Sequence, residues 1–105
     1  MSLTELKEVL EATGLPVAYL AFKTAQQLPF IVYREVNTDN FFADNKVYKK
    51  CLYVDIELYT ENKAIETEEI IETILFENEI AWNATDTHIE AEEMFQRVYE
   101  IKLIY

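Results

Sequence analysis

The clearest pattern along the chain lies between Lys50 and Lys63, where two kinds of residue alternate strictly over the eight residues 52–59. One set of alternate positions is apolar and the other is aromatic or acidic: Leu52, Val54, Ile56 and Leu58 against Tyr53, Asp55, Glu57 and Tyr59. Successive side chains of a strand point to opposite faces, so this period predicts a half-buried strand. A strand with one wet face is typical of an antiparallel sheet.

Two other segments have the periodicity of amphipathic helices. The first is predicted over residues 3–13, opened by a capping box of Ser2 and Glu5. Gly14, the only glycine of the chain, follows where a helix C-terminal cap favours glycine. The second helix is predicted over residues 67–77, where acidic side chains crowd the opening turns and suit the helix dipole.

The remaining apolar runs predict strands over residues 17–22, 30–36, 47–59, 80–89 and 94–105. Residues 25–29 are predicted to form a connection. Residues 37–45 are rich in turn formers and are predicted to be irregular. The order is therefore α-β-β-β-α-β-β, which predicts a two-layer α+β fold with a mostly antiparallel sheet. A chain of 105 residues without an internal linker fits a single domain over residues 1–105.

Charge is distributed unevenly along the chain. Residues 1–54 carry six basic and six acidic groups, whereas residues 55–105 carry fourteen acids against three bases, which accounts for the whole net charge of −11. An acidic chain repels the phosphate backbone, so no specific nucleic-acid binding is expected. A solvated acidic face that aids solubility is one explanation of the asymmetry, and a surface for a basic partner is the other.

Targeting signals are not evident in the sequence. The first residues contain acids where a secretory leader needs a basic end and an apolar run, so no leader is expected. No apolar stretch approaches the length of a membrane span, and no membrane partner is expected. The single cysteine, Cys51, precludes an intrachain disulfide and is compatible with a reducing compartment.

Catalytic and metal-binding chemistry finds little support. One histidine and one cysteine cannot build a zinc site within one chain, and no phosphate-cradling loop can form with one glycine. Cys51 and His88 would be a nucleophile and base only if folding joined them, and a buried core cysteine is the better interpretation. The acids near Asp86 and at Glu90, Glu92 and Glu93 lack a calcium-loop pattern. No enzyme activity, cofactor or metal is expected.

Aromatic residues are frequent, with seven tyrosines and six phenylalanines. Phe41 and Phe42 stand out because a polar loop rarely carries two adjacent phenylalanines. They either fold back over the core or serve as an anchor for a neighbouring subunit. We expect the 37–45 segment to be mobile in an isolated monomer and to become ordered on assembly.

Several segments resemble the small tail-completion and tail-to-head joining proteins of long-tailed bacteriophages and of prophages of Gram-positive bacteria. The similar segments span residues 13–19 (TGLPVAY), 28–33 (LPFIVY), 43–45 (ADN), 54–60 (VDIELYT) with Lys63, and 99–101 (YEI). The resemblance covers nearly the whole chain. Its motifs are structural rather than catalytic.

The resemblance implies a non-catalytic virion protein that forms a ring, most simply a hexamer, at the head–tail junction. Its expected partners are further copies of itself, the head connector and the tail-tube protein, with DNA passing through the ring, and it would be made in the host cytoplasm. The candidate assembly residues are Phe41, Phe42, Asp44, Asn45, Tyr53 and Tyr59. A generic acidic α+β module that binds a basic protein remains the alternative. The acidic second half would suit the lumen of a DNA conduit.

Overall fold

The computed structural model describes residues 1–105 and confirms an α+β fold with two helices and a mostly antiparallel sheet. The elements run α1 (Leu3–Glu11), β1 (Val17–Tyr19), β2 (Phe30–Thr38), β3 (Phe41–Ala43), β4 (Lys46–Lys49), β5 (Cys51–Thr60), α2 (Ile65–Glu77), β6 (Trp82–Ile89), a 3₁₀ turn η1 (Glu90–Glu92) and β7 (Met94–Ile104). Neither helix is long and apolar enough to cross a membrane.

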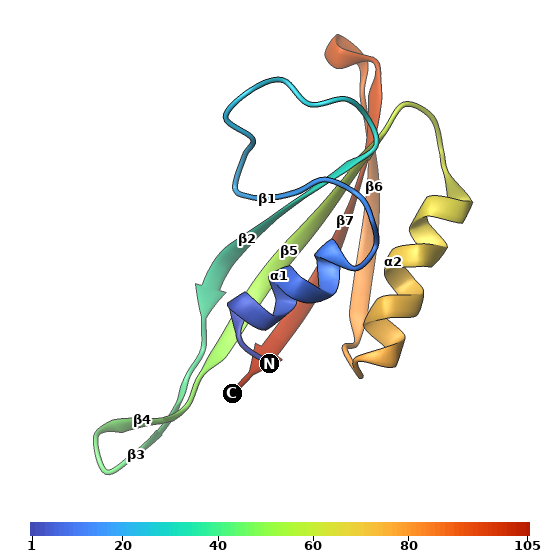
Figure 1. The fold of residues 1–105 in the computed structure, drawn as a ribbon. Coiled ribbons are helices and arrows are strands. Elements are labelled where there is room, and N and C mark those ends of the chain that lie inside the picture. The colour runs from blue at the N-terminus through green and yellow to red at the C-terminus, as the bar shows by residue number, and fades with distance from the viewer.

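Five strands form the main sheet in the order β1-β2-β5-β7-β6. β5 pairs antiparallel with both β2 and β7, β6 pairs antiparallel with β7, and only the short β1 runs parallel to its neighbour β2. Both helices contribute buried residues to a single core on one face of the sheet, as Figure 1 shows. We call these helices and this sheet the body.

The alternation of β5 is confirmed by its burial. Val54, Ile56 and Leu58 are almost fully buried in the core, and the odd-numbered residues between them are only half-buried on the opposite face. The helices therefore bury the same stripe of β5 that the sequence pattern singled out. Each helix contributes two fully buried leucine or isoleucine side chains to this core, namely Leu6 and Leu10 of α1 and Ile71 and Leu75 of α2.

The local signals at the helix ends hold as well. The Ser2 hydroxyl accepts a hydrogen bond from the Glu5 N–H at 3.3 Å, and the Glu5 carboxylate accepts from the Ser2 N–H at 3.4 Å, so the capping box is present. Gly14 follows α1 in the left-handed region at φ 83°, which only glycine adopts without cost. α1 ends at Glu11, two residues earlier than predicted, and α2 begins at Ile65, two residues earlier than predicted.

The prediction that residues 37–45 form an irregular segment was wrong. β2 continues to Thr38, and after a short break Phe41–Ala43 and Lys46–Lys49 pair as a two-stranded antiparallel hairpin. The predicted strand over residues 47–59 is accordingly two strands, β4 and β5, which separate at Lys50. We call residues 41–50 the arm. It projects from one end of the body (Figure 1). The molecule is therefore elongated, with extents of 50 × 27 × 23 Å.

Residues 20–29, between β1 and β2, form a loop over part of the face that the helices leave free. Phe22 packs edge-on against Phe30 at 5.4 Å between ring centroids, and Phe30 stacks on Tyr59 at 5.0 Å. Val32 is buried beneath this loop and does not belong to the main core. The sheet is thus covered by helices on one face and by a loop on the other. Figure 1 shows this loop at the end of the body away from the arm.

Candidate assembly surface

The arm is built around a tight turn at Asp44 and Asn45. Both residues have positive φ, 51° and 61°, and they connect the directly opposed Ala43 and Lys46. Two consecutive positive φ values define a type I′ turn, whose twist matches that of the paired strands and for which Asp and Asn are well suited. Phe42 lies opposite Val47 across the hairpin, so an aromatic and a β-branched side chain pack as a cross-strand pair.

The arm exposes its apolar side chains. Every residue from 41 to 50 is exposed, and Phe42 and Tyr48 each expose 73% of their surface. Phe41 and Val47 add further exposed apolar area, about half of each residue being accessible. The interpretation of Phe41 and Phe42 as residues folded back over the core was therefore wrong. A cluster of exposed large apolar residues marks an interaction surface more often than an isolated one does.

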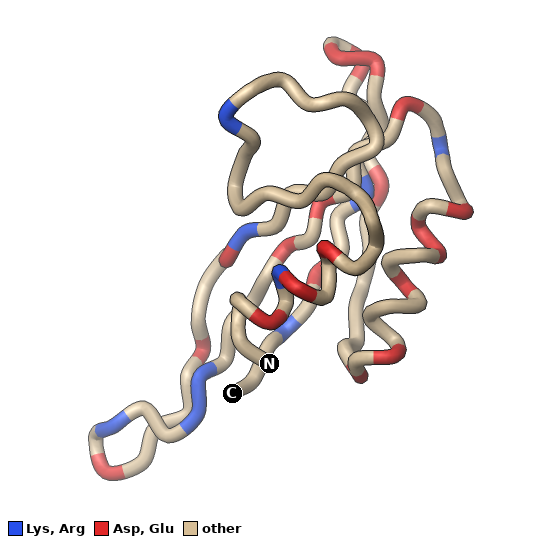
Figure 2. Tube along the Cα trace, viewed as in Figure 1, with Lys and Arg blue, Asp and Glu red and all other residues tan.

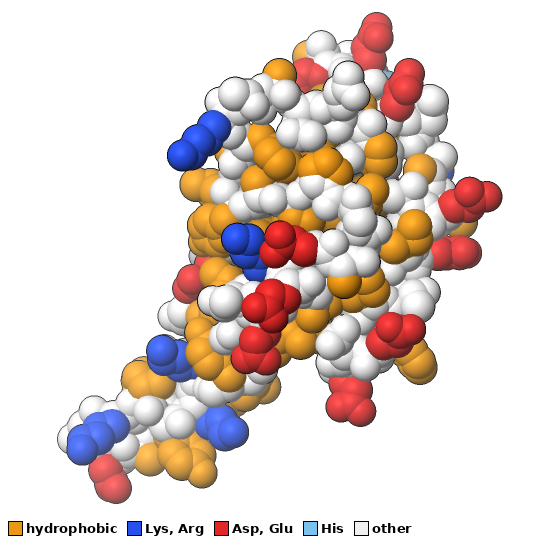
Figure 3. All heavy atoms as spheres, viewed as in Figure 1, with side chains coloured by type: hydrophobic (Ala, Val, Ile, Leu, Met, Phe, Trp, Pro, Cys, Tyr) orange, Lys and Arg blue, Asp and Glu red, His pale blue; other side chains and the backbone are white.

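The arm is also basic, in contrast to the rest of the molecule. It carries Lys46, Lys49 and Lys50 against Asp44, whereas α2 carries five acids and no base. Figure 2 shows these opposite charges at separate places on the chain, and Figure 3 shows hydrophobic and basic side chains next to one another on the arm. At the base of the arm, the Lys50 ammonium lies 5.6 Å from the centre of the Tyr105 ring.

The candidate assembly residues do not all lie together. Phe41, Phe42, Asp44 and Asn45 share the arm, but Tyr53 and Tyr59 lie on the free face of β5 within the body. Tyr53 is half-buried, with the Lys102 ammonium 5.6 Å from its ring centre. These two tyrosines belong to a different surface from the four arm residues.

Tyr59 lies at a pocket between the 20–29 loop and the sheet. Its hydroxyl donates to the Glu57 carboxylate at 2.8 Å and accepts from the Gln96 amide at 2.9 Å. Burial, together with the bond to Glu57, raises the pKa of Tyr59 to about 12, so the phenol stays neutral. The pocket has a volume of about 300 Å³ and eight of its eleven lining residues are hydrophobic, among them Leu20, Phe22 and Met94.

The loop reaches this position through a sharp reversal at Leu20. The Ala21 N–H donates to the Tyr19 carbonyl at 2.7 Å, and Leu20 between them has a φ of 67°. A leucine in the left-handed region is uncommon and is held there by its surroundings. Here the Leu20 N–H also donates to the Tyr33 carbonyl at 2.8 Å, which ties the start of the loop to β2.

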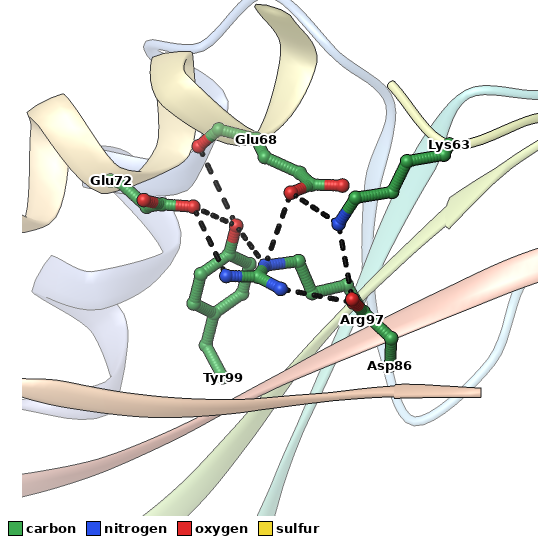
Figure 4. A network of polar contacts seen from close by, with 6 residues as sticks. All are labelled: Lys63, Glu68, Glu72, Asp86, Arg97 and Tyr99. Carbon is green, nitrogen blue, oxygen red and sulfur yellow. Dashed lines mark hydrogen bonds and ion pairs between the residues drawn. The ribbon is translucent and has the colours of Figure 1, made fainter. Parts of the chain in front are cut away.

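A cluster of polar side chains, which the sequence did not predict, lies between α2 and the sheet (Figure 4). Arg97 of β7 is its centre. Its guanidinium lies 3.0 Å from Asp86, 3.4 Å from Glu68 and 3.6 Å from Glu72. Lys63 completes the cluster at 2.9 Å from Glu68 and 3.0 Å from Asp86.

Each charge in this cluster has partners of the opposite sign. The Tyr99 hydroxyl donates to Glu72 at 2.8 Å and accepts from the Arg97 Nε at 3.1 Å. Burial alone would raise the pKa of Asp86, but hydrogen bonds from Arg97 and Lys63 outweigh it and lower the pKa. Because no member is left unpartnered, we interpret the cluster as the attachment of α2 to β6 and β7 rather than as a reactive site.

Cys51 and His88 are not brought together. Cys51 pairs with Ile104 at one end of β7, and His88 reaches Phe95 near the other end through β6, where the two rings stack at 4.7 Å. Nine residues of β7 separate these register positions, and at roughly 3.3 Å per residue the two side chains lie about 30 Å apart. The pair cannot act as nucleophile and base. Cys51 is fully buried, as predicted for a core cysteine.

Comparisons with known proteins do not assign the chain to a family. No protein-family model matches the chain, and no curated protein is significantly similar to it. The function is therefore inferred from the arm, the pocket and the charges of the chain, together with the resemblance of its segments to tail-completion proteins.

Two features of this surface were missed from the sequence. The first is the hairpin itself, in which Phe41–Ala43 pairs with Lys46–Lys49, since residues 47–49 were predicted only as the start of a longer strand. A weak signal for it exists, because Asp44 and Asn45 both tolerate positive φ and lie between two short runs that contain apolar residues. The second is the pocket, and no local signal announces it, since its walls come from a loop and from strands distant in the sequence.

Proposed function

We propose that this chain is a structural, non-catalytic virion protein of a long-tailed phage or prophage, which assembles into a ring that completes the tail and joins it to the head. The observation that carries the proposal is the arm, an exposed aromatic and basic hairpin on an otherwise acidic molecule. The resemblance of several segments to tail-completion proteins supplies the location and the expectation of a hexamer.

An exposed hairpin of this kind adds little to the stability of the isolated chain. A two-stranded hairpin is at best marginally stable in water, and its apolar side chains contribute to stability only when something covers them. Large aromatic side chains are common anchors of protein–protein interfaces. A second copy of the chain is a suitable partner, because the remaining surface is strongly acidic and the arm is basic.

The placement of the arm is compatible with a ring, which the resemblance to tail-completion proteins implies. The arm lies at one end of an elongated molecule, and the surfaces that oppose it in charge lie elsewhere on the chain (Figure 2). A contact between two different surfaces that repeats head to tail is heterologous, and it closes into a ring when the rotation between copies permits. A net charge of −11 per copy would also discourage adhesion of DNA that passes through such a ring.

The ring would bind the head connector on one side and the tail-tube protein on the other. These partners follow from the resemblance, as does the location at the head–tail junction of the virion after synthesis in the host cytoplasm. A second candidate function is an acidic module that binds a basic protein. It is favoured by α2, whose outer surface combines acids with exposed Phe76 and Ile70.

Light scattering over a concentration series, with negative-stain imaging, tests the proposal. We expect rings of uniform size that dissociate on dilution. Replacing both anchors, Phe41→Ala with Phe42→Ala, should shift the midpoint of assembly to at least about tenfold higher concentration. Phe76→Ala, which changes a still more exposed phenylalanine on α2, is the matched control and should leave the midpoint unchanged.

Two results would contradict the proposal. A monomer at every concentration, which also fails to bind purified tails or heads, would favour the acidic binding module. Open filaments or two-fold dimers in place of closed rings would refute the ring while leaving self-association in place.

A further inference from the structure

We propose that the arm of one copy docks in the pocket beneath the 20–29 loop of the next copy. This inference rests on the proposed self-assembly and specifies the receiving site, so it fails separately if the chain assembles by another contact. Phe42 and Val47 would occupy the apolar pocket, and the lysines of the arm would lie against the acidic β6–β7 turn beside it.

The pocket suits an apolar side chain in size and chemistry. It has walls from two sides: the loop contributes Leu20 and Phe22, and the sheet contributes Phe30 and Met94. Its volume of about 300 Å³ is at the small end of ligand-binding pockets, which suits one or two side chains better than a cofactor. Aromatic walls favour an aromatic guest, because edge-to-face pairs add to the free energy of burial.

The arm presents a guest of this kind. Phe42 and Val47 are paired across the hairpin close to the turn, so they form one apolar tip rather than two separate side chains. Phe42 is among the most exposed phenylalanines of the molecule. The type I′ turn at Asp44 and Asn45 keeps this tip narrow.

The charges of the two surfaces are complementary. The arm carries three lysines and one aspartate, which sum to +2. The receiving side carries Glu90, Glu92 and Glu93 in the β6–β7 turn and Lys23 in the loop, which sum to −2. Glu92 itself lines the pocket. An apolar tip with a basic rim thus meets an apolar pocket with an acidic rim, the arrangement that gives specificity and steers association.

The two surfaces cannot meet within one chain. Figure 1 shows the arm at one end of the body and the 20–29 loop and β6–β7 turn at the other, and the molecule is 50 Å long. Docking therefore links different copies, and a head-to-tail repeat of this contact would build the proposed ring.

α2 is the rival receiving surface, since it is acidic as well. The hollow beside Phe76 is lined by five residues of one continuous segment, residues 76–81. Charge does not separate the two candidates, but the apolar lining does, because eight hydrophobic residues line the pocket beneath the loop and three line the hollow beside Phe76.

A charge exchange tests the pairing. Lys46→Glu with Lys49→Glu in the arm should raise the assembly midpoint at least about tenfold, and Glu90→Lys with Glu92→Lys beside the pocket should do the same. The four changes combined in one chain should restore assembly. The matched control is Glu66→Lys with Glu69→Lys, an equal change of charge at exposed positions of α2, which should leave the midpoint near that of the wild type.

Cross-linking tests the contact directly. Ala43→Cys in the arm and Gln26→Cys at the pocket should be joined between copies by a short bismaleimide, whereas Ala43→Cys with Thr73→Cys on α2 should not. Cys51 can stay in place because it is fully buried. Denaturing gels then show a ladder of linked copies for the first pair alone.

The outcomes separate the two proposals. Rings that survive the Glu90 and Glu92 changes, or that cross-link through α2, would overturn pocket docking and leave the ring intact. A wild-type chain that forms no assembly would overturn both.

Discussion

The body and the arm are both β-structure, yet they are stabilised by different means. In the body, β5 lies between two neighbours and beneath two helices, and Ile56 at its centre is fully buried. In the arm, β3 and β4 have only one another, and no residue between 41 and 50 is buried. Antiparallel pairing of strands thus occurs in the body above a buried core and in the arm without one.

This difference suggests that the body determines the stability of the fold and that the arm is available for association. Hydrogen-bonded strands alone contribute little net stability, because water satisfies the same groups in the unfolded chain. Burial of apolar area contributes most. Changes in the body should therefore alter the free energy of unfolding, whereas changes in the arm should alter association.

The largest effect is expected at the centre of the body. Ile56→Ala removes buried apolar atoms from β5 and leaves a cavity beneath the helices. We expect a loss of about 3 kcal/mol in the free energy of unfolding. Urea unfolding followed by circular dichroism measures it. A loss below about 1 kcal/mol would mean that the core around β5 is loosely packed.

A smaller effect is expected from the polar cluster that attaches α2. Arg97→Met leaves Glu68, Glu72 and Asp86 near one another with only Lys63 to balance them. We expect a loss of about 2 kcal/mol in the free energy of unfolding, because the Arg97 side chain is only 19% exposed. The same urea titration measures it.

Arg34→Met is the matched control for this prediction. Arg34 also pairs with two acids, Asp55 and Glu57, but 44% of its side chain is exposed. Its removal should cost less than about 1 kcal/mol. Equal losses in the two variants would show that burial does not distinguish the two clusters.

The body was largely predictable from the sequence because its signals are local. Alternation in β5, the capping box at Ser2 and the left-handed Gly14 each depend on neighbours in the chain, and each was confirmed. The two-layer fold follows, since each apolar face must be covered by another. The cluster around Arg97 did not follow, because Lys63, Asp86 and Arg97 come from separate elements and meet only after folding.

The arm was mispredicted for a related reason. Its turn formers indicated an irregular segment, but Asp44 and Asn45 join two strands rather than interrupt them. Phe41 and Phe42 were singled out as unusual for a polar loop, and their exposure could not be read from the sequence. Tyr53 and Tyr59 were predicted on the wet face of a strand, where the fold places them, but this face lies apart from the arm.

The dependence of stability on pH gives a finer comparison within the body. The pKa of Asp86 is lowered, so its contribution is present above its unfolded pKa of about 3.9 and is lost as the pH falls through its lower folded pKa. The pKa of Asp55 is raised by burial, which Arg34 only partly offsets, so its protonation favours the folded form. The two carboxylates therefore change the free energy of unfolding in opposite directions as the pH falls.

Two variants measure these signs. Asp86→Asn should be less stable than the wild type at neutral pH, and the difference should shrink as the pH falls below about 4. Asp55→Asn should be as stable as the wild type or more stable at neutral pH, and its stability should fall more steeply in acid. Urea unfolding at a series of pH values reports both, and parallel curves for the two variants would contradict the assignment.

The smallest effect on folding is expected in the arm. Phe41→Ala with Phe42→Ala should change the free energy of unfolding of the monomer by less than about 0.5 kcal/mol, because both side chains are exposed. Hydrogen exchange should show the amides of residues 41–49 exchanging faster than those of β5 in the monomer and slowing on assembly, since local opening is easy where few apolar contacts hold a ladder.

The measurement that decides between anchor and core is the comparison of these two quantities in one variant. An anchor loses assembly while the thermal midpoint of the monomer stays where it was. If that midpoint falls as much as it does for Ile56→Ala, the arm packs on the body in solution and the two phenylalanines stabilise the fold. Strong protection of the arm amides in the monomer would lead to the same conclusion, because an exposed two-stranded ladder does not protect its amides without added contacts.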